Sequence, residues 1–215
     1  MSTFDTISGF GIIPVIAIED AGDALPLADA LIEGGLPVAE ITFRTAAALD
    51  AIRQIAQHRP TIHIGAGTIL DETQLDAAID AGARFGLSPG LDLDVVARAR
   101  QRGLPFAPGI MTPTDIQAAL KAGCRLVKFF PAMAAGGPNM LKNLAAPYAH
   151  TGLGFNPTGG VNLDNLGEWL AIPKVRAVGG TWIATKADIA AGRWDTIAAN
   201  AREAVARVRT LRKAK

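Results

Sequence analysis

The stretch Arg125-Leu126-Val127-Lys128-Phe129-Phe130-Pro131 has the pattern of a buried β-strand that carries one lysine near its end. Lysine is almost never fully buried unless it is paired or used in chemistry. Burial favours the neutral amine, and a neutral amine attacks carbonyl carbon. Lys128 is therefore a candidate Schiff-base residue; the alternative is a lysine at the rim whose ammonium group reaches solvent.

Strands of this kind recur along the chain in alternation with helical patterns. Gly82, Gly103 and Gly123 end successive helices at intervals of 21 and 20 residues, which is typical of a repeated strand–helix unit. Eight strands are expected, at 12–18, 38–43, 62–66, 84–87, 105–108, 126–130, 154–157 and 175–178. Helices are expected near 23–34, 46–57, 71–81, 92–102, 113–122, 138–145, 163–170 and 188–211.

This alternation predicts parallel strands joined by right-handed crossovers. Eight such units predict an α/β fold of the (β/α)8 TIM-barrel type, with a doubly wound open sheet as the alternative. No linker or low-complexity segment interrupts the chain, so we expect one barrel domain over residues 1–215. A short helix over 2–9 is expected to cover the bottom of the barrel.

The composition excludes several classes of function. With 21 basic and 20 acidic residues, the formal charge of +1 gives no electrostatic reason to expect nucleic acid or a membrane surface as a partner. The single cysteine, Cys124, rules out an intrachain disulfide, and its apolar neighbours predict a buried, unreactive thiol. No secretory signal or membrane-spanning run is expected, so a cytoplasmic location is predicted.

The second expected strand carries charged residues where a core would not tolerate them. Glu40, Thr42 and Arg44 alternate along it and share one face. Glu40 and Arg44 lie about 13 Å apart on an extended strand, so they are not expected to pair with each other. A carboxylate suits proton transfer, and a guanidinium suits the capture of a substrate carboxylate. The alternative is an outward-facing network of ion pairs with the helices.

Other strand ends offer hydroxyls and flexible backbone. Thr68 follows Gly65-Ala66-Gly67, and Pro89 lies in the turn Ser88-Pro89-Gly90. The glycine pairs in Thr158-Gly159-Gly160 and Gly179-Gly180-Thr181 follow the last two strands, where barrels of this type commonly bind phosphate. Such turns could aim N–H groups and hydroxyls at an anion, although glycine pairs also serve chain geometry alone.

No cofactor is expected. The three histidines, His58, His63 and His150, lack metal-site spacing, and no nucleotide-binding glycine motif is present. A lysine, a carboxylate, an arginine and a phosphate cup favour carbon–carbon bond chemistry on a phosphorylated keto acid through an imine.

The same segments resemble the bacterial 2-keto-3-deoxy-6-phosphogluconate (KDPG) and 4-hydroxy-2-oxoglutarate (KHG) aldolase family over nearly the whole chain. The motifs that carry the resemblance are Glu40-Ile41-Thr42-Phe43-Arg44-Thr45, Gly65-Ala66-Gly67-Thr68, Ser88-Pro89-Gly90, Val127-Lys128-Phe129-Phe130-Pro131-Ala132, Pro157-Thr158-Gly159-Gly160 and Gly179-Gly180-Thr181-Trp182. Two positions depart from the familiar pattern: Thr181 stands where serine is also familiar, and Phe43 where leucine is.

The resemblance implies a role for each matching residue. Lys128 would be the Schiff-base lysine, and Glu40 would be the general acid and base, working through a bound water. The implied substrate-binding residues are Arg44 and Thr68 as the carboxylate clamp, Pro89 and Phe130 as pocket walls, and Thr158. The implied phosphate-binding residues are Gly159, Gly160, Gly180 and Thr181.

The resemblance also implies a metal-free class I aldolase of the Entner–Doudoroff pathway. It would cleave KDPG reversibly to pyruvate and glyceraldehyde 3-phosphate, as a homotrimer. The alternatives are a KHG aldolase yielding glyoxylate and pyruvate, decarboxylation of oxaloacetate through the same enamine, a phosphate-binding barrel isomerase or epimerase, and a catalytically silent barrel used for binding or assembly.

Overall fold

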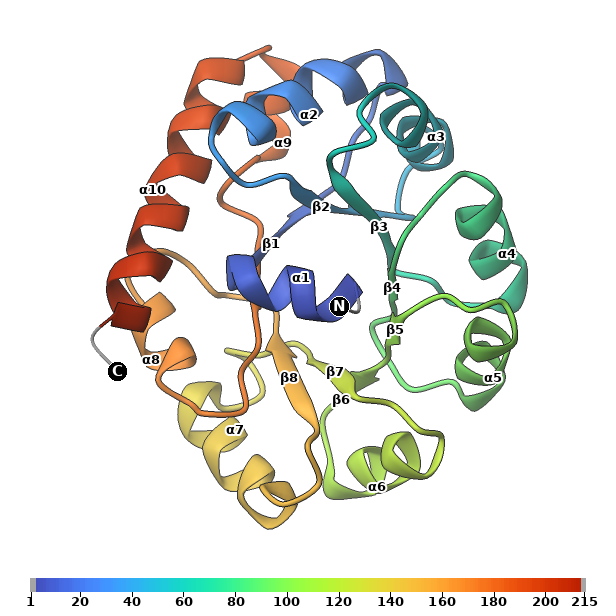
Figure 1. Ribbon diagram of the computed structural model, residues 1–215, viewed down its shortest axis with the longest axis vertical. Helices are drawn as coiled ribbons and strands as arrows, with labels where there is room; N and C mark the ends of the chain where they lie inside the picture. Colours follow the sequence, from blue (N-terminus) through green and yellow to red (C-terminus); the bar gives the residue numbers. More distant parts are fainter. Residues whose placement is uncertain (1–2, 214–215) are drawn as a thin grey trace.

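The strands of the computed structural model, which describes residues 3–213, are all parallel and lie inside a ring of helices (Figure 1). One sheet has six strands in the order β5-β4-β3-β2-β1-β9, and a second has three in the order β6-β7-β8. The strands are β1 (Ile12–Ile16), β2 (Val38–Thr42), β3 (His63–Gly67), β4 (Gly86–Leu87), β5 (Phe106–Ala107), β6 (Gly109–Ile110), β7 (Leu126–Phe129), β8 (Gly154–Pro157) and β9 (Val178–Gly180).

The two sheets adjoin at both edges. Only Pro108 separates β5 from β6, and a proline has no N–H to donate to the ladder. On the other side, isolated bridges join Phe155 to Val175 and Thr158 to Gly179. The fold is therefore a curled, TIM-barrel-like parallel sheet, but its ladder is divided into two sheets where one continuous barrel was expected.

Two strand predictions need correction. The strand expected at 105–108 is divided by Pro108 into β5 and β6. The strand expected at 175–178 begins only at Val178. Before it, Val175 makes one isolated bridge to Phe155 of β8, in which Phe155 N donates to Lys174 O and Arg176 N donates to Phe155 O.

The helices lie near their expected positions. They are α1 (Thr3–Phe10), α2 (Ala24–Glu33), α3 (Ala48–His58), α4 (Glu72–Asp80), α5 (Leu93–Gln101), α6 (Pro113–Lys121), α7 (Gly137–Ala145), α8 (Leu166–Leu170), α9 (Lys186–Ala190) and α10 (Trp194–Lys213), with 3-10 turns at Ala21–Asp23 and Ala146–Tyr148. The single helix expected over 188–211 is in fact two helices, since Gly192 adopts a left-handed φ of 61° between them.

The repeated glycines end α4, α5 and α6 as predicted. Gly82, Gly103 and Gly123 have φ values of 97°, 72° and 84°, a conformation that glycine adopts without steric cost. The next residue then donates back into the helix, as in Ala83 N to Ala78 O at 3.0 Å. Each glycine thus turns the chain toward the next strand.

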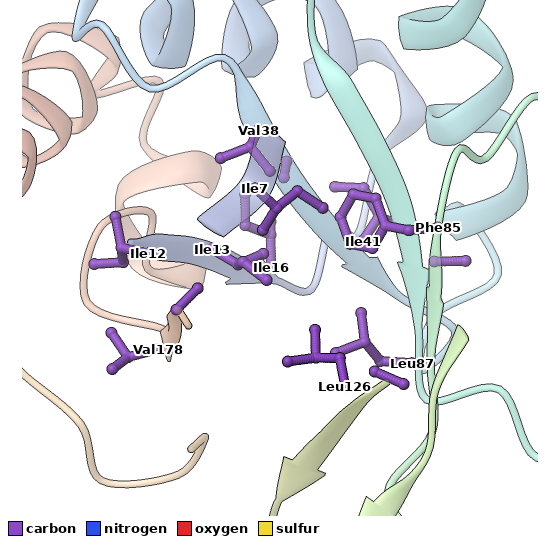
Figure 2. Close-up of a cluster of buried hydrophobic side chains, with 14 of the residues drawn as sticks. Ile7, Ile12, Ile13, Ile16, Val38, Ile41, Phe85, Leu87, Leu126 and Val178 are labelled. Carbon is purple, nitrogen blue, oxygen red and sulfur yellow. The ribbon is translucent and has the colours of Figure 1, made fainter. Parts of the chain in front are cut away.

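Helix α1 lies across one end of the ring, at the amino ends of the strands (Figure 1). Ile7 is buried with side chains from several strands (Figure 2), and the Phe4 ring contacts Phe85 edge-on. The predicted N-terminal helix is confirmed, although Ser2, where it was expected to begin, lies outside the described residues. The carboxyl ends of the strands lie at the opposite end of the ring.

Two smaller findings complete the fold. Among residues 3–213, no helix is long and apolar enough to cross a membrane. Cys124 is a free, buried thiol, and burial raises its pKa to about 11, as expected for an unreactive cysteine.

We predict that Asp76 links α4 to α5 in a pH-dependent way. Its carboxylate accepts from Arg98 Nη2 and Arg102 Nη1, each at 2.7 Å, and the hydrogen bond from Arg98 is the main reason that its pKa is lowered. A carboxyl whose pKa is lower in the folded state stabilises the fold above its unfolded pKa, and the contribution is lost as pH falls through the folded value.

Asp76→Asn should therefore unfold more easily than the wild type in urea at pH 7, and the difference should shrink as the pH is lowered toward 3. Asp50→Asn, which removes an exposed pair with Arg53 inside one helix, is the control. A difference that is unchanged between pH 7 and pH 3 would contradict this role for Asp76.

Candidate active site

Lys128 forms a buried ion pair with Glu40. Its Nζ lies 2.9 Å from Glu40 Oε1, and the two side chains are 6% and 0% exposed. Lys128 extends from β7 and Glu40 from β2, so the pair spans the interior of the ring. The prediction that Lys128 is buried is confirmed, and Glu40 and Arg44 do not pair with each other, as expected. The pairing of Glu40 with Lys128 was not predicted, because the two residues lie 88 positions apart in the sequence.

Gly67 on β3 makes room for the Glu40 carboxylate. A Cβ atom at this position would overlap Glu40 Oε1 and crowd the rest of the carboxyl group. The second oxygen, Oε2, is buried and has no hydrogen-bond partner among the described residues. Glu40 thus presents one oxygen to Lys128 and keeps an acceptor that a substrate hydroxyl or a water molecule could use.

Arg44 is held by a residue whose role the sequence did not reveal. Arg44 Nε donates to Thr42 Oγ1 at 3.2 Å, and the buried Thr42 hydroxyl donates to Ile16 O at 3.0 Å. Arg44 itself is exposed, and within residues 3–213 its hydrogen bond is made by Nε and none by its terminal nitrogens. Thr42 therefore fixes the guanidinium through Nε and leaves its bidentate edge available for an anion.

The three predicted pocket residues lie at strand ends on the same side of the ring. The Phe130 ring, 36% exposed, has its centroid 5.7 Å from Lys128 Nζ. Thr68 follows β3 with a φ of 59°, an uncommon left-handed conformation for threonine, and Pro89 follows β4. In the described chain no hydrogen bond joins Thr68 or Pro89 to Lys128 or Glu40, whereas Phe130 makes a cation–π contact with Lys128.

The glycine loop after β8 has free donors. Gly159 and Gly160 have φ values of 101° and 76°, and their N–H groups find no acceptor in residues 3–213. Their loop is tied to the end of β7, because Ala132 N donates to Thr158 O at 2.8 Å and Met133 N donates to Gly159 O at 3.0 Å. These donors suit an anion.

Gly180 and Thr181 lie at the end of β9. Gly180 is buried, and a Cβ there would overlap the Trp182 ring, whereas Thr181 is exposed. The bridge between Thr158 and Gly179 places this strand end beside the loop after β8. The two glycine pairs predicted to form one cup are therefore neighbours.

The Thr158 hydroxyl, which was expected to face an anion, is hydrogen-bonded inside the protein. It is buried, and its Oγ1 donates to Asn156 Oδ1 at 3.2 Å. Asn156 was not identified as a site residue from the sequence. It could have been, because it lies two residues before Thr158 in an apolar strand and therefore shares the same face of that strand.

The chemistry of the site follows from the Lys128–Glu40 contact. A proton that moves from Nζ to Oε1 would leave a neutral amine and a neutral carboxyl, with no charge transferred to solvent. The amine would then be a nucleophile and the carboxyl a proton donor within hydrogen-bond distance. No three His, Cys, Asp or Glu side chains in residues 3–213 are grouped to hold a metal ion.

Comparison with known proteins gives one consistent family. The family model described as KDPG and KHG aldolase matches residues 5–200. A Haemophilus influenzae protein named 2-dehydro-3-deoxy-phosphogluconate aldolase is 46% identical over 194 residues, which cover 90% of this chain and 91% of that protein.

Solved structures agree with the sequence comparison. The KDPG aldolase of Legionella pneumophila, with pyruvate captured at low pH as a covalent carbinolamine, matches with a TM-score of 0.89 and 36% identity over 94% of this chain and 97% of the other. The KDPG aldolase of Zymomonas mobilis with 3-phosphoglycerate matches with a TM-score of 0.85 and 38% identity over 94% and 95% of the two chains.

We predict that Gly67→Ala displaces the Glu40 carboxylate. The added methyl group would occupy the place of Oε1, so Glu40 must move away from Lys128, at a cost of about 1–3 kcal/mol in unfolding free energy. Gly90→Ala is the matched control, since a Cβ there meets nothing within 4 Å. Crystal structures and urea unfolding would test this; an undisturbed 2.9 Å contact in Gly67→Ala would contradict it.

Proposed function

The chain belongs to the KDPG and KHG aldolase family, and we propose that it cleaves KDPG reversibly to pyruvate and glyceraldehyde 3-phosphate through an imine on Lys128. KDPG is the compound also called 2-dehydro-3-deoxy-6-phosphogluconate. The buried contact of 2.9 Å between Lys128 Nζ and Glu40 Oε1 carries this proposal, since it joins the two groups that the chemistry needs.

The first step is formation of the imine. Neutral Lys128 attacks the C2 carbonyl of the keto acid, forming an N–C bond while the carbonyl oxygen takes up a proton. Loss of that oxygen as water gives an iminium ion. Glu40 acts as the proton donor and acceptor in these transfers, since it is the carboxyl group nearest to Nζ.

The second step breaks the carbon–carbon bond. Glu40, through a bound water, removes the proton of the C4 hydroxyl, the C3–C4 bond breaks, and glyceraldehyde 3-phosphate leaves. The electron pair moves into the iminium, which becomes an enamine, so the reaction as proposed needs no metal or cofactor. Glu40 then returns a proton to C3, and hydrolysis of the imine releases pyruvate.

The remaining residues bind the two ends of the substrate. Arg44 and Thr68 would hold the carboxylate, with Pro89 and Phe130 as the walls of the pocket. The phosphate would bind at the N–H groups of Gly159 and Gly160 and at Gly180 and Thr181. The unpaired donors in the loop after β8 and the bridge between β8 and β9 support this assignment.

Several wider features belong to the same proposal. The two sheets would act as one closed (β/α)8 barrel and the chain as one domain, since Pro108 and the β8–β9 bridges join the sheet edges. A homotrimer and a cytoplasmic location remain predictions from the resemblance and the composition.

The second candidate function is the cleavage of KHG, since the matched family also includes KHG aldolases. Both substrates yield pyruvate, but only KDPG carries a phosphate for the glycine loops. A phosphate-binding isomerase or epimerase is less favoured, because it needs no lysine that forms a covalent bond. A catalytically silent barrel is also less favoured, because the buried Lys128–Glu40 pair would then have no function.

We predict that the wild-type protein releases pyruvate from KDPG with a higher kcat/KM than from KHG, and that Lys128→Arg abolishes both reactions. A guanidinium stays protonated and cannot form the imine. Pyruvate release can be followed with lactate dehydrogenase, and circular dichroism would show that the variant is folded. Retained cleavage by folded Lys128→Arg would disprove the imine mechanism.

We predict that Glu40→Gln cleaves KDPG about 10²- to 10⁴-fold more slowly, which is the usual range for loss of a general acid and base. The amide keeps the shape of the side chain but cannot take up a proton. Imine formation should still occur, but more slowly, because water can replace Glu40 in those proton transfers. It is measured as inactivation by borohydride that depends on pyruvate. Full turnover in Glu40→Gln would show that another group transfers the proton.

A further inference from the structure

Asn156 is a fully buried polar residue beside Lys128. It lies on β8 and is paired in register with Lys128 on β7, so the two side chains leave the sheet on the same side. Asn156 Nδ2 donates to Ala177 O at 3.0 Å, and Asn156 Oδ1 accepts from Thr158 Oγ1 at 3.2 Å. The amide thus connects the segment before β9 with the end of β8.

The directions of these hydrogen bonds are fixed by chemistry. The carbonyl of Ala177 can only accept, so the amide must turn its NH₂ group toward it. Oδ1 then faces Thr158, and an amide oxygen can also only accept, so the hydroxyl proton of Thr158 must point at Asn156. Because a hydroxyl has one proton, Thr158 keeps only its acceptor capacity.

Packing holds the hydroxyl in this place. A Cβ atom at Gly179 would overlap Thr158 Oγ1, so the oxygen lies directly over the backbone of β9. The bridge between Thr158 and Gly179 fixes the two strands at the same level. Glycine at 179 therefore gives the Thr158 hydroxyl its space, and Asn156 gives it its direction.

We propose that Asn156 is a positioning residue that makes the Thr158 hydroxyl a hydrogen-bond acceptor in the active site. The inference rests on the proposed function for its catalytic consequence. Thr158 receives a hydrogen bond from a hydroxyl group of the substrate and does not donate to the phosphate or the carboxylate, both of which offer only acceptors at neutral pH. Anion binding is left to the other groups already assigned to it: Arg44 and Thr68 for the carboxylate, and the glycine loops with Thr181 for the phosphate.

The first test needs no substrate. The unfolding equilibrium constants of the wild type, Asn156→Leu, Thr158→Val and the double variant form a double-mutant cycle. We expect the two changes to deviate from additivity by about 3- to 10-fold, as for one buried hydrogen bond. Additive effects would overturn the proposal, and Asn156→Ala replaces Asn156→Leu in the cycle should the latter fail to fold.

The second test measures whether the effect of Asn156 on catalysis depends on the Thr158 hydroxyl. Asn156→Leu should lower kcat/KM for KDPG about 5- to 10-fold in the wild type and equally in Thr158→Ser, which keeps the hydroxyl, but by less than about 2-fold in Thr158→Val. An equal loss in all three backgrounds would show that Asn156 acts structurally and would overturn the proposal.

Failure of this proposal can be distinguished from failure of the proposed function. A wild-type protein that does not cleave KDPG refutes the proposed function, whereas the unfolding cycle still decides whether Asn156 holds the Thr158 hydroxyl.

Discussion

The buried ion pair between Lys128 and Glu40 is the constraint on which the rest of the site depends. Removing two charges from water costs several kcal/mol per ion, and their attraction repays this only when the geometry is good. Apolar residues of the same volume would give a core at least as stable. The pair is therefore better explained by chemistry than by stability: at 2.9 Å it can pass a proton between an amine and a carboxyl without involving solvent.

The neighbours of the pair work by fixing direction as well as distance. Gly67 leaves the space that Glu40 Oε1 occupies, Thr42 holds Arg44 by Nε, and Asn156 turns the Thr158 hydroxyl. All of them lie on strands or just after them, where the backbone is held by ladder hydrogen bonds. At the opposite end of the ring α1 lies over the amino ends of the strands (Figure 1). Its Ile7 is buried there, so one end is closed by apolar packing while the other carries the polar groups of the site.

Much of this could be predicted from local sequence. The glycine spacing 82, 103 and 123 indicated the repeated unit, and a lysine in an apolar strand indicated a reactive site. Three features could not be predicted, because each depends on contacts that are distant in sequence or on hydrogen-bond geometry. Glu40 pairs with a residue 88 positions away, Pro108 divides a strand whose residues otherwise suit one ladder, and the Thr158 proton is directed by Asn156 through the Ala177 carbonyl. Gly192 could have been read as a helix end, because the apolar stripe that indicated the last helix, from Ile197 to Leu211, lies entirely after it.

The most direct test is to incubate the wild-type protein with pyruvate and borohydride and to map the modified peptide by mass spectrometry. A reduced pyruvyl adduct on Lys128, absent when borohydride or pyruvate is omitted, is the expected result. It would tie the buried amine to the keto acid by a covalent bond. No adduct on folded protein with excess pyruvate, or an adduct on another lysine, would contradict the role assigned to the Lys128–Glu40 pair.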